Sequence, residues 1–302
     1  MSVELAHVSK WYGNIVAVND VSFTLTPGVT GLLGPNGAGK STILHMLVGL
    51  LRPSSGTVTL DGVPTWQHPE IYRTLGFVPE SESVYSFLTG VELVRLNARL
   101  QQIPDIDGAV RRAIDLVEMT AAQDRPVATY SKGMRQRIKI AAMLVHSPRV
   151  LLLDEPFNGM DPKQRLQMMA VLRRLADAGS TVLVSSHILE EVDRLADTVL
   201  VIIGGRLAAS GTSRVIRQLM TDRPHTFTVR TSDDRLIASR LIRQDITASV
   251  EVTAAGLSIR TSDLGTFTRL LPSLAREASV SILEVHPADE SLESVFSYLV
   301  QG

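Results

Sequence analysis

The 302-residue sequence contains no cysteine. Disulfide bonds, thiolate metal sites and cysteine nucleophiles are therefore excluded. A chain without cysteine suits the cytosol, where thiols stay reduced and disulfides contribute nothing to stability.

Long apolar runs are also missing. No stretch approaches the roughly 18 consecutive apolar residues that a membrane-spanning helix requires, and Met1–Leu5 lack the basic-then-apolar layout of a signal peptide. If a membrane is involved, we expect a partner protein to span it.

Neither sign of charge is in excess, since 30 basic residues face 31 acidic ones and the formal net charge is −1. No broad positive field is available to hold a nucleic-acid backbone. We therefore expect no nucleic-acid partner.

The strongest motif is the eight-position pattern G-x-x-x-x-G-K-[ST], which begins a nine-residue segment. This segment consists of Gly34, Pro35, Asn36, Gly37, Ala38, Gly39, Lys40, Ser41 and Thr42. An apolar run, Val29–Leu33, precedes it and a helical pattern, Lys40–Leu51, follows. Small residues let consecutive backbone N–H groups surround a phosphate at the positive end of the helix. This context favours a phosphate site over the alternative, a glycine-rich turn with a surface lysine.

Two side chains of the segment have specific chemistry. Lys40 can reach the β- and γ-phosphates as a point charge, and the Ser41 hydroxyl is placed to complete the shell of a Mg²⁺ ion that keeps most of its waters. The sequence thus predicts a site for a nucleotide with Mg²⁺.

Two acidic residues follow another buried strand. The apolar run Val150–Leu153 ends in Asp154 and Glu155, and α/β folds bind ligands at the carboxyl ends of such strands. Asp154 is the candidate metal-shell carboxylate, and Glu155 is free to orient or deprotonate a water. The alternative, two solvated strand-end acids, is disfavoured by the phosphate segment.

Two predicted helices begin with good N-capping residues. Ser131 is a natural N-cap, and Gly133 leaves the first-turn amides uncovered, which makes a second helix end that is suited to an anion. Asp161 caps a later helix whose first residue is Pro162.

His187 and Tyr12 each have two interpretations. His187 follows the apolar strand Thr181–Ser185, at the sheet edge that carries the acids, which favours chemistry over a solvated role. Tyr12 lies in the turn Trp11–Asn14 and either stacks on a flat base or packs within its hairpin.

We expect two domains, because single cores stop growing near about 250–300 residues. The first, 1–220, is strand-rich with a helical insertion at about 83–145. Residues 221–302 have the order strand, helix, two strands, helix, strand, which is typical of a small split β-α-β unit. A last helix is expected at Leu292–Val300.

The phosphate segment, the helix start at Ser131, the Asp154–Glu155 strand end and His187, in that order, resemble the nucleotide-binding domain of ATP-binding cassette (ABC) transporters over about residues 3–212. The resemblance implies a P-loop α/β fold with a mixed sheet core, an antiparallel β-subdomain and a helical insertion, before the small α+β domain. It also implies an ATPase on the cytoplasmic face of the cell membrane that energises a separate transmembrane permease.

The resemblance implies a role for each candidate residue. Gly34–Ser41 is the Walker A loop, Leu151–Glu155 closes Walker B, and Tyr130–Met134 is the signature segment. The implied roles are the general base for Glu155, the γ-phosphate contact for His187, the conserved-loop aspartate for Asp161 and adenine stacking for Tyr12. Ser131 and Gly133 serve the nucleotide of a second copy, so a homodimer across two ATP molecules is implied.

The sequence departs from the family pattern at two places. The signature usually reads Leu-Ser-Gly-Gly-Gln, whereas residues 130–134 read Tyr-Ser-Lys-Gly-Met. Lys132 and Met134 depart from the usual pattern, and Ser131 and Gly133 keep it. Glu80 stands where the family has glutamine; an acid still binds Mg²⁺ or water and adds negative charge near the γ-phosphate. The segments Gly76–Glu80 and Ser291–Phe296 resemble the branch that pairs with export-type permeases.

Two other functions are compatible with such a cassette. A soluble ATPase that acts on ribosomes or nucleic acid is disfavoured by the single cassette and the near-neutral charge. A nucleotide sensor without catalysis is disfavoured by the presence of Glu155 and His187. For the C-terminal unit, regulation, a dimer contact and a permease clamp all stay open.

Overall fold

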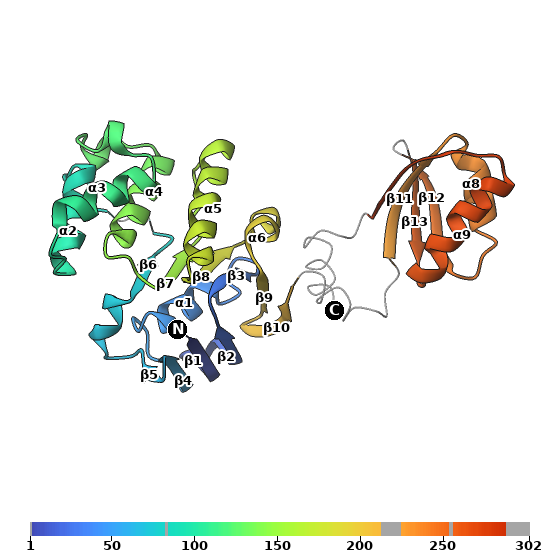
Figure 1. Cartoon of the computed structure of the whole chain (residues 1–302). Coiled ribbons are helices and arrows are strands. Elements are labelled where there is room, and N and C mark those ends of the chain that lie inside the picture. Colours follow the sequence, from blue (N-terminus) through green and yellow to red (C-terminus); the bar gives the residue numbers. More distant parts are fainter. Residues whose placement is uncertain (1, 82–83, 213–224, 254–255, 288–302) are drawn as a thin grey trace. The chain divides into compact units, whose positions relative to one another are not determined.

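The computed structural model describes residues 2–81, 84–212, 225–253 and 256–287. The chain separates into two compact units, Met1–Ser210 and Gly211–Gly302 (Figure 1). The predicted boundary near residue 220 and the predicted helix Leu292–Val300 lie outside the described residues.

The first unit is built on a six-stranded sheet with the order β10-β9-β3-β8-β7-β6 (Figure 1). Its strands are β3 (Gly28–Leu33), β6 (Leu75–Val78), β7 (Val150–Asp154), β8 (Thr181–Ser186), β9 (Thr198–Ile203) and β10 (Arg206–Gly211). From β9 to β6 neighbouring strands run parallel, so their carboxyl ends meet at one edge. Every residue of β7 and β8 is buried, as expected for strands covered on both faces.

Alternate residues of the central strands point into two cores, one on each face of this sheet. Leu151 and Leu153 join the core that contains α5 (Pro162–Asp177). Val150 and Leu152 point the other way and join the core that contains α1 (Lys40–Leu47). The sheet is therefore the middle layer between helices.

A second, antiparallel sheet with the order β2-β1-β4-β5 shares the core of α1. Its strands are β1 (Val3–Tyr12), β2 (Ile15–Leu25), β4 (Ser55–Leu60) and β5 (Val63–Pro64). The predicted turn between the first two strands is present at Gly13 and Asn14. This sheet is the predicted antiparallel β-subdomain.

Three helices form the predicted insertion: α2 (Gly90–Leu100), α3 (Ile106–Leu116) and α4 (Lys132–Leu144). A capping box of Thr89 and Glu92 starts α2, because each side chain accepts from the other residue's backbone N–H. Apolar side chains of all three helices continue the core of α5.

Two helices differ from the prediction. The helix predicted over Lys40–Leu51 ends at Leu47, because Gly49 adopts a left-handed φ of 67° that stops a helix. The short helix α6 (Leu189–Leu195) after His187 was not predicted, because seven residues carry too little periodicity to identify a helix.

The second unit has the predicted order of a split β-α-β fold. Its elements are β11 (His225–Thr231), α8 (Asp234–Leu241), β12 (Thr247–Thr253), β13 (Gly256–Thr261), α9 (Leu264–Glu277) and β14 (Ile282–Pro287). The strand order is β12-β13-β11-β14, with antiparallel neighbours. Phe227 of β11 stacks on Phe267 of α9 at 4.9 Å between ring centroids, inside a core of its own.

Candidate functional site

The loop between β3 and α1 is pressed against neighbouring backbone. A Cβ atom on Gly34 would lie 2.4 Å from the carbonyl oxygen of Ile202 in β9. A Cβ on Gly39 would lie 2.5 Å from the carbonyl oxygen of Ala17 in β2, and Gly39 has a left-handed φ of 103°. Only glycine fits at these positions, so the loop is shaped by its backbone contacts with two strands.

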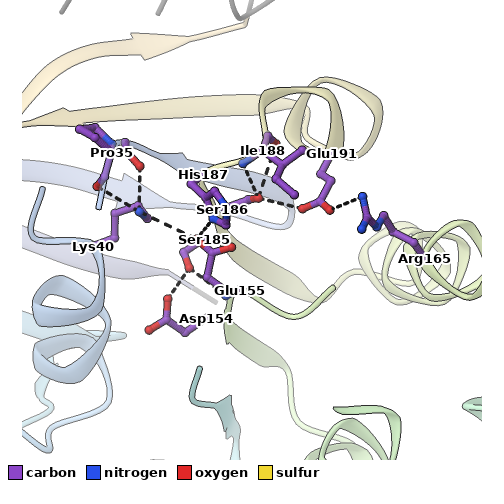
Figure 2. A network of polar contacts seen from close by, with 11 residues as sticks. Pro35, Lys40, Asp154, Glu155, Arg165, Ser185, Ser186, His187, Ile188 and Glu191 are labelled. Carbon is purple, nitrogen blue, oxygen red and sulfur yellow. Dashed lines mark hydrogen bonds and ion pairs between the residues drawn. The ribbon is translucent and has the colours of Figure 1, made fainter. Parts of the chain in front are cut away.

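Lys40, the first residue of α1, is buried and lies along the inside of this loop. Its Nζ donates hydrogen bonds to the carbonyl oxygens of Gly34 at 2.8 Å and Pro35 at 3.3 Å (Figure 2). The ammonium group is thus placed where a phosphate that enters the loop meets a positive charge.

Glu155 lies opposite Lys40, just beyond the end of β7. Its Oε1 is 3.9 Å from Lys40 Nζ and 2.9 Å from His187 Nδ1 (Figure 2). Since an ionised carboxylate only accepts, Nδ1 carries the hydrogen and Nε2 of His187 stays available to another ligand. Glu155 is only 6% exposed and has a left-handed φ of 48°. Such backbone strain is often found at functional sites.

Asp154 points to a different partner from its neighbour. Its buried carboxylate accepts a hydrogen bond from the Ser185 hydroxyl near the end of β8 (Figure 2). The same Ser185 oxygen accepts the backbone N–H of Glu155 at 3.1 Å. One serine therefore fixes both acids, and the sequence reasoning missed it, although a hydroxyl at the carboxyl end of an apolar strand was a signal.

A polar network continues from the other side of His187. The hydroxyl of Ser186 donates to Glu191 of α6 at 2.8 Å, and Glu191 forms an ion pair with Arg165 of α5 at 3.0 Å (Figure 2). Burial raises the pKa of the Glu191 carboxyl. The sequence reasoning did not identify these residues, because the helix α6 was not predicted and Arg165 lies 26 positions before its partner Glu191.

The predicted residues Ser131, Gly133 and Asp161 belong to a second group. Ser131 caps α4 by accepting the N–H of Met134 at 3.2 Å, and Asp161 caps α5 by accepting the N–H of Gln164 at 2.8 Å. A Cβ on Gly133 would approach the carbonyl oxygen of Gly159 to 2.8 Å. The start of α4 therefore packs against the segment that leads to Asp161.

Tyr12 and Glu80 are exposed. Tyr12 is 49% exposed at the end of β1, and Lys10 Nζ lies 5.4 Å from its ring centroid. Glu80 follows β6 and lines a pocket together with Lys132 and Asn158.

Within the described residues, no group of three or more His, Asp or Glu side chains is gathered closely enough to cage a metal ion. None of the helices that the structure describes has the length and apolar character needed to cross a bilayer.

The chain is similar to a known protein family. A family model described as "ABC transporter" matches residues 18–158. The daunorubicin/doxorubicin resistance ATP-binding protein DrrA of Streptomyces peucetius is 34% identical, over 98% of this chain and 91% of its own length. The bacitracin transport ATP-binding protein BcrA of Enterococcus faecalis is 31% identical, over 99% of this chain and 96% of its own. A solved dimeric bacterial ABC transporter cassette, MJ0796, is similar with a TM-score of 0.65 and 26% identity, over 70% of this chain and 98% of that one.

Proposed function

The chain belongs to the ATP-binding subunits of ABC transporters, and from this premise we propose how its own residues bind and hydrolyse ATP. As a member of this family it is an ATPase that energises a separate transmembrane permease of the export type, and two copies assemble across ATP. The observation that supports the assignment of residues best is the contact of Glu155 with both Lys40 and His187.

Glu155 is the general base in this proposal. Its carboxylate stands at the carboxyl end of a central strand, and Lys40 marks the position of the phosphates. A water between Glu155 and the γ-phosphate would lose its proton to the carboxylate as it attacks in line. Burial at 6% exposure keeps the carboxylate from being solvated by bulk water, which strengthens its interaction with that one water.

The loop between β3 and α1 binds the triphosphate together with Lys40. The backbone N–H groups of Gly34–Thr42 surround the phosphates, and Lys40 exchanges its carbonyl partners for phosphate oxygens. Tyr12 is exposed and stacks on the adenine ring. His187, oriented by Glu155 through Nδ1, offers Nε2 to the γ-phosphate.

Mg²⁺ fits the oxygen donors of this site. The buried Asp154 carboxylate and the Ser41 hydroxyl are hard ligands, and Mg²⁺ is held by one or two protein oxygens plus phosphates and waters rather than by a protein cage. When bound it neutralises charge that develops on the phosphate oxygens. Glu80 is a further carboxylate that would bind the ion or one of its waters.

Ser131, Gly133 and Asp161 act on the nucleotide of the second copy in this proposal. The capped start of α4 presents helix-end amides, and it packs against the segment before Asp161. The start of α4 and the Asp161 segment therefore form one surface that faces the partner's phosphate loop. The assembly lies on the cytoplasmic face of the cell membrane, where its permease spans the bilayer.

The role of Glu155 as general base is tested by measuring ATP turnover of the Glu155→Gln variant. We expect kcat to fall about 10² to 10⁴-fold while ATP affinity stays within a few-fold, because the amide keeps the shape but does not accept a proton. Phosphate release and binding of a fluorescent ATP analogue are measured on the full chain, with Glu190→Gln as the control for loss of an exposed acid. Undiminished turnover would remove Glu155 from the role of base.

A further inference from the structure

An ion pair between a buried carboxylate and a partly exposed guanidinium lies beside His187. Glu191, in the first turn of α6, is only 5% exposed, and its Oε1 is 3.0 Å from Nη1 of Arg165. Burying a carboxylate is costly unless it is paired. Removal of either charge would therefore disturb the position of the other, so the ion pair links α6 to α5.

The same carboxylate holds the backbone around His187. The Ser186 hydroxyl donates to Glu191 Oε2 at 2.8 Å and accepts the N–H of Ile188 at 3.0 Å (Figure 2). Residues on both sides of His187 are thus tied to one hydroxyl, whose direction is set by Glu191. The Cα of His187 is thus fixed from both sides, and Glu155 then holds the imidazole at Nδ1 at 2.9 Å.

Arg165 connects the pair to the Asp161 segment. Its backbone N–H donates to the carbonyl oxygen of Asp161 at 2.9 Å in the first turn of α5. A shift of Asp161 therefore shifts the Arg165 backbone, and the ion pair at the other end of the Arg165 side chain passes that shift to Glu191.

We propose that Arg165 and Glu191 are positioning residues that transmit the position of the Asp161 segment to His187. The inference rests on the proposed roles of His187 at the γ-phosphate and of the Asp161 segment at the second copy. When the two copies close, contact at Asp161 then aligns His187 in the same subunit. Hydrolysis is thereby coupled to completed assembly.

The first test compares Glu191→Gln with Glu190→Gln. The two residues are neighbours in α6, but Glu190 is exposed, with its side chain at 73% accessibility, and pairs with Arg194 on the surface. We expect kcat of Glu191→Gln to fall about 10-fold with KM for ATP within about two-fold, because misplacement of a reacting group costs rate rather than binding. Glu190→Gln should match the unsubstituted chain, and melting curves verify that both variants fold.

The second test separates positioning from general stability. In a His187→Ala background, the added Glu191→Gln change should lower kcat by less than about two-fold, because the residue acts through His187. A structural role would instead give losses that multiply. Arg165→Met should reproduce the loss of Glu191→Gln, and the Arg165→Met/Glu191→Gln double variant should be no worse than either single one.

Normal kcat in Glu191→Gln, or losses that multiply with His187→Ala, would overturn the inference. Should Glu191→Gln fail to fold, Arg165→Lys serves instead, since it keeps the charge and should lose less turnover than Arg165→Met. Full turnover in Glu155→Gln would count against the proposed base instead. An inactive Glu155→Gln chain together with a normal Glu191→Gln chain would reject only the positioning role.

Discussion

At the scale of single residues, the glycines of the phosphate loop do two different things. Gly37 and Gly39 both have a left-handed φ, at 78° and 103°. A Cβ on Gly37 would have nothing within 4 Å, whereas a Cβ on Gly39 would meet the carbonyl oxygen of Ala17 at 2.5 Å. Gly37 is thus required only by its backbone angles, and Gly39 by the angles and by the contact with β2.

This difference predicts unequal effects of alanine. Gly37→Ala should lower the free energy of unfolding by about 1–2 kcal/mol, the cost of a left-handed alanine. Gly39→Ala adds overpacking of about 1–3 kcal/mol against backbone that does not yield, and it should also weaken ATP binding. Denaturant unfolding and titration with a non-hydrolysable ATP analogue measure both effects. Equal losses in the two variants would show that the contact with Ala17 carries no cost.

At the scale of elements, α4 is fastened to the segment that carries Glu80. The Lys139 side chain of α4 is buried, and its Nζ donates to the carbonyl oxygens of Pro79 and Ser81, each at 2.7 Å. The two carbonyls stand on either side of Glu80. The helix that begins at Ser131 and the segment of Glu80 are therefore one connected unit.

Loss of this connection has a predicted cost. Lys139→Met keeps the apolar stem but leaves two carbonyl groups without their charged donor, which should lower the free energy of unfolding by about 1–3 kcal/mol. Lys139→Arg should lose less of the free energy of unfolding than Lys139→Met, because arginine keeps a charged donor. Thermal and denaturant unfolding provide the measurement, and Lys163→Met, at an exposed position of α5, is the control. A loss from Lys163→Met as large as that from Lys139→Met would reject a specific role for the contacts of Lys139 with Pro79 and Ser81.

The elements also show where sequence reasoning succeeds. The strands β3, β7 and β8 were predicted because each is a continuous apolar run bounded by glycine, proline or polar residues. Asp154, Glu155 and His187 were grouped because parallel strands end at a common edge. The structure joins Glu155 to His187 as this grouping requires.

The remaining contacts depend on packing between distant segments. Ser185 lies 31 residues from the carboxylate that it contacts, and no local pattern encodes that distance. Glu190 and Glu191 are adjacent acids in one short helix, so composition does not distinguish the exposed one from the buried one. The tertiary fold makes that choice, because Val192 and Leu195 turn the Glu191 side of α6 inward.

At the scale of the whole molecule, each unit encloses a core of its own. The residues proposed for nucleotide chemistry all lie in Met1–Ser210, and they fall into two groups: Lys40 with Glu155 and His187, and Ser131 with Asp161. In a dimer, the Lys40 group of one chain faces the Ser131 group of the other chain, so each ATP site is completed from two chains. Defects in the two groups should therefore complement one another.

Mixing two inactive variants tests this arrangement. Lys40→Ala should abolish ATP hydrolysis in its own phosphate loop, and Ser131→Arg should block the partner's site by placing a bulky cation at the capped start of α4. In a mixed dimer, one site combines an intact Lys40 with an intact Ser131, while the other site carries both defects. At equal concentrations about half of the dimers are mixed, and each has one of two sites intact. Phosphate release should therefore recover to about a quarter of the unsubstituted rate when each intact site hydrolyses ATP on its own.

A mixture as inactive as either variant alone, with mixed dimers verified by differential tagging, would contradict a site that Lys40 of one chain and Ser131 of the other complete and that works independently of the second site.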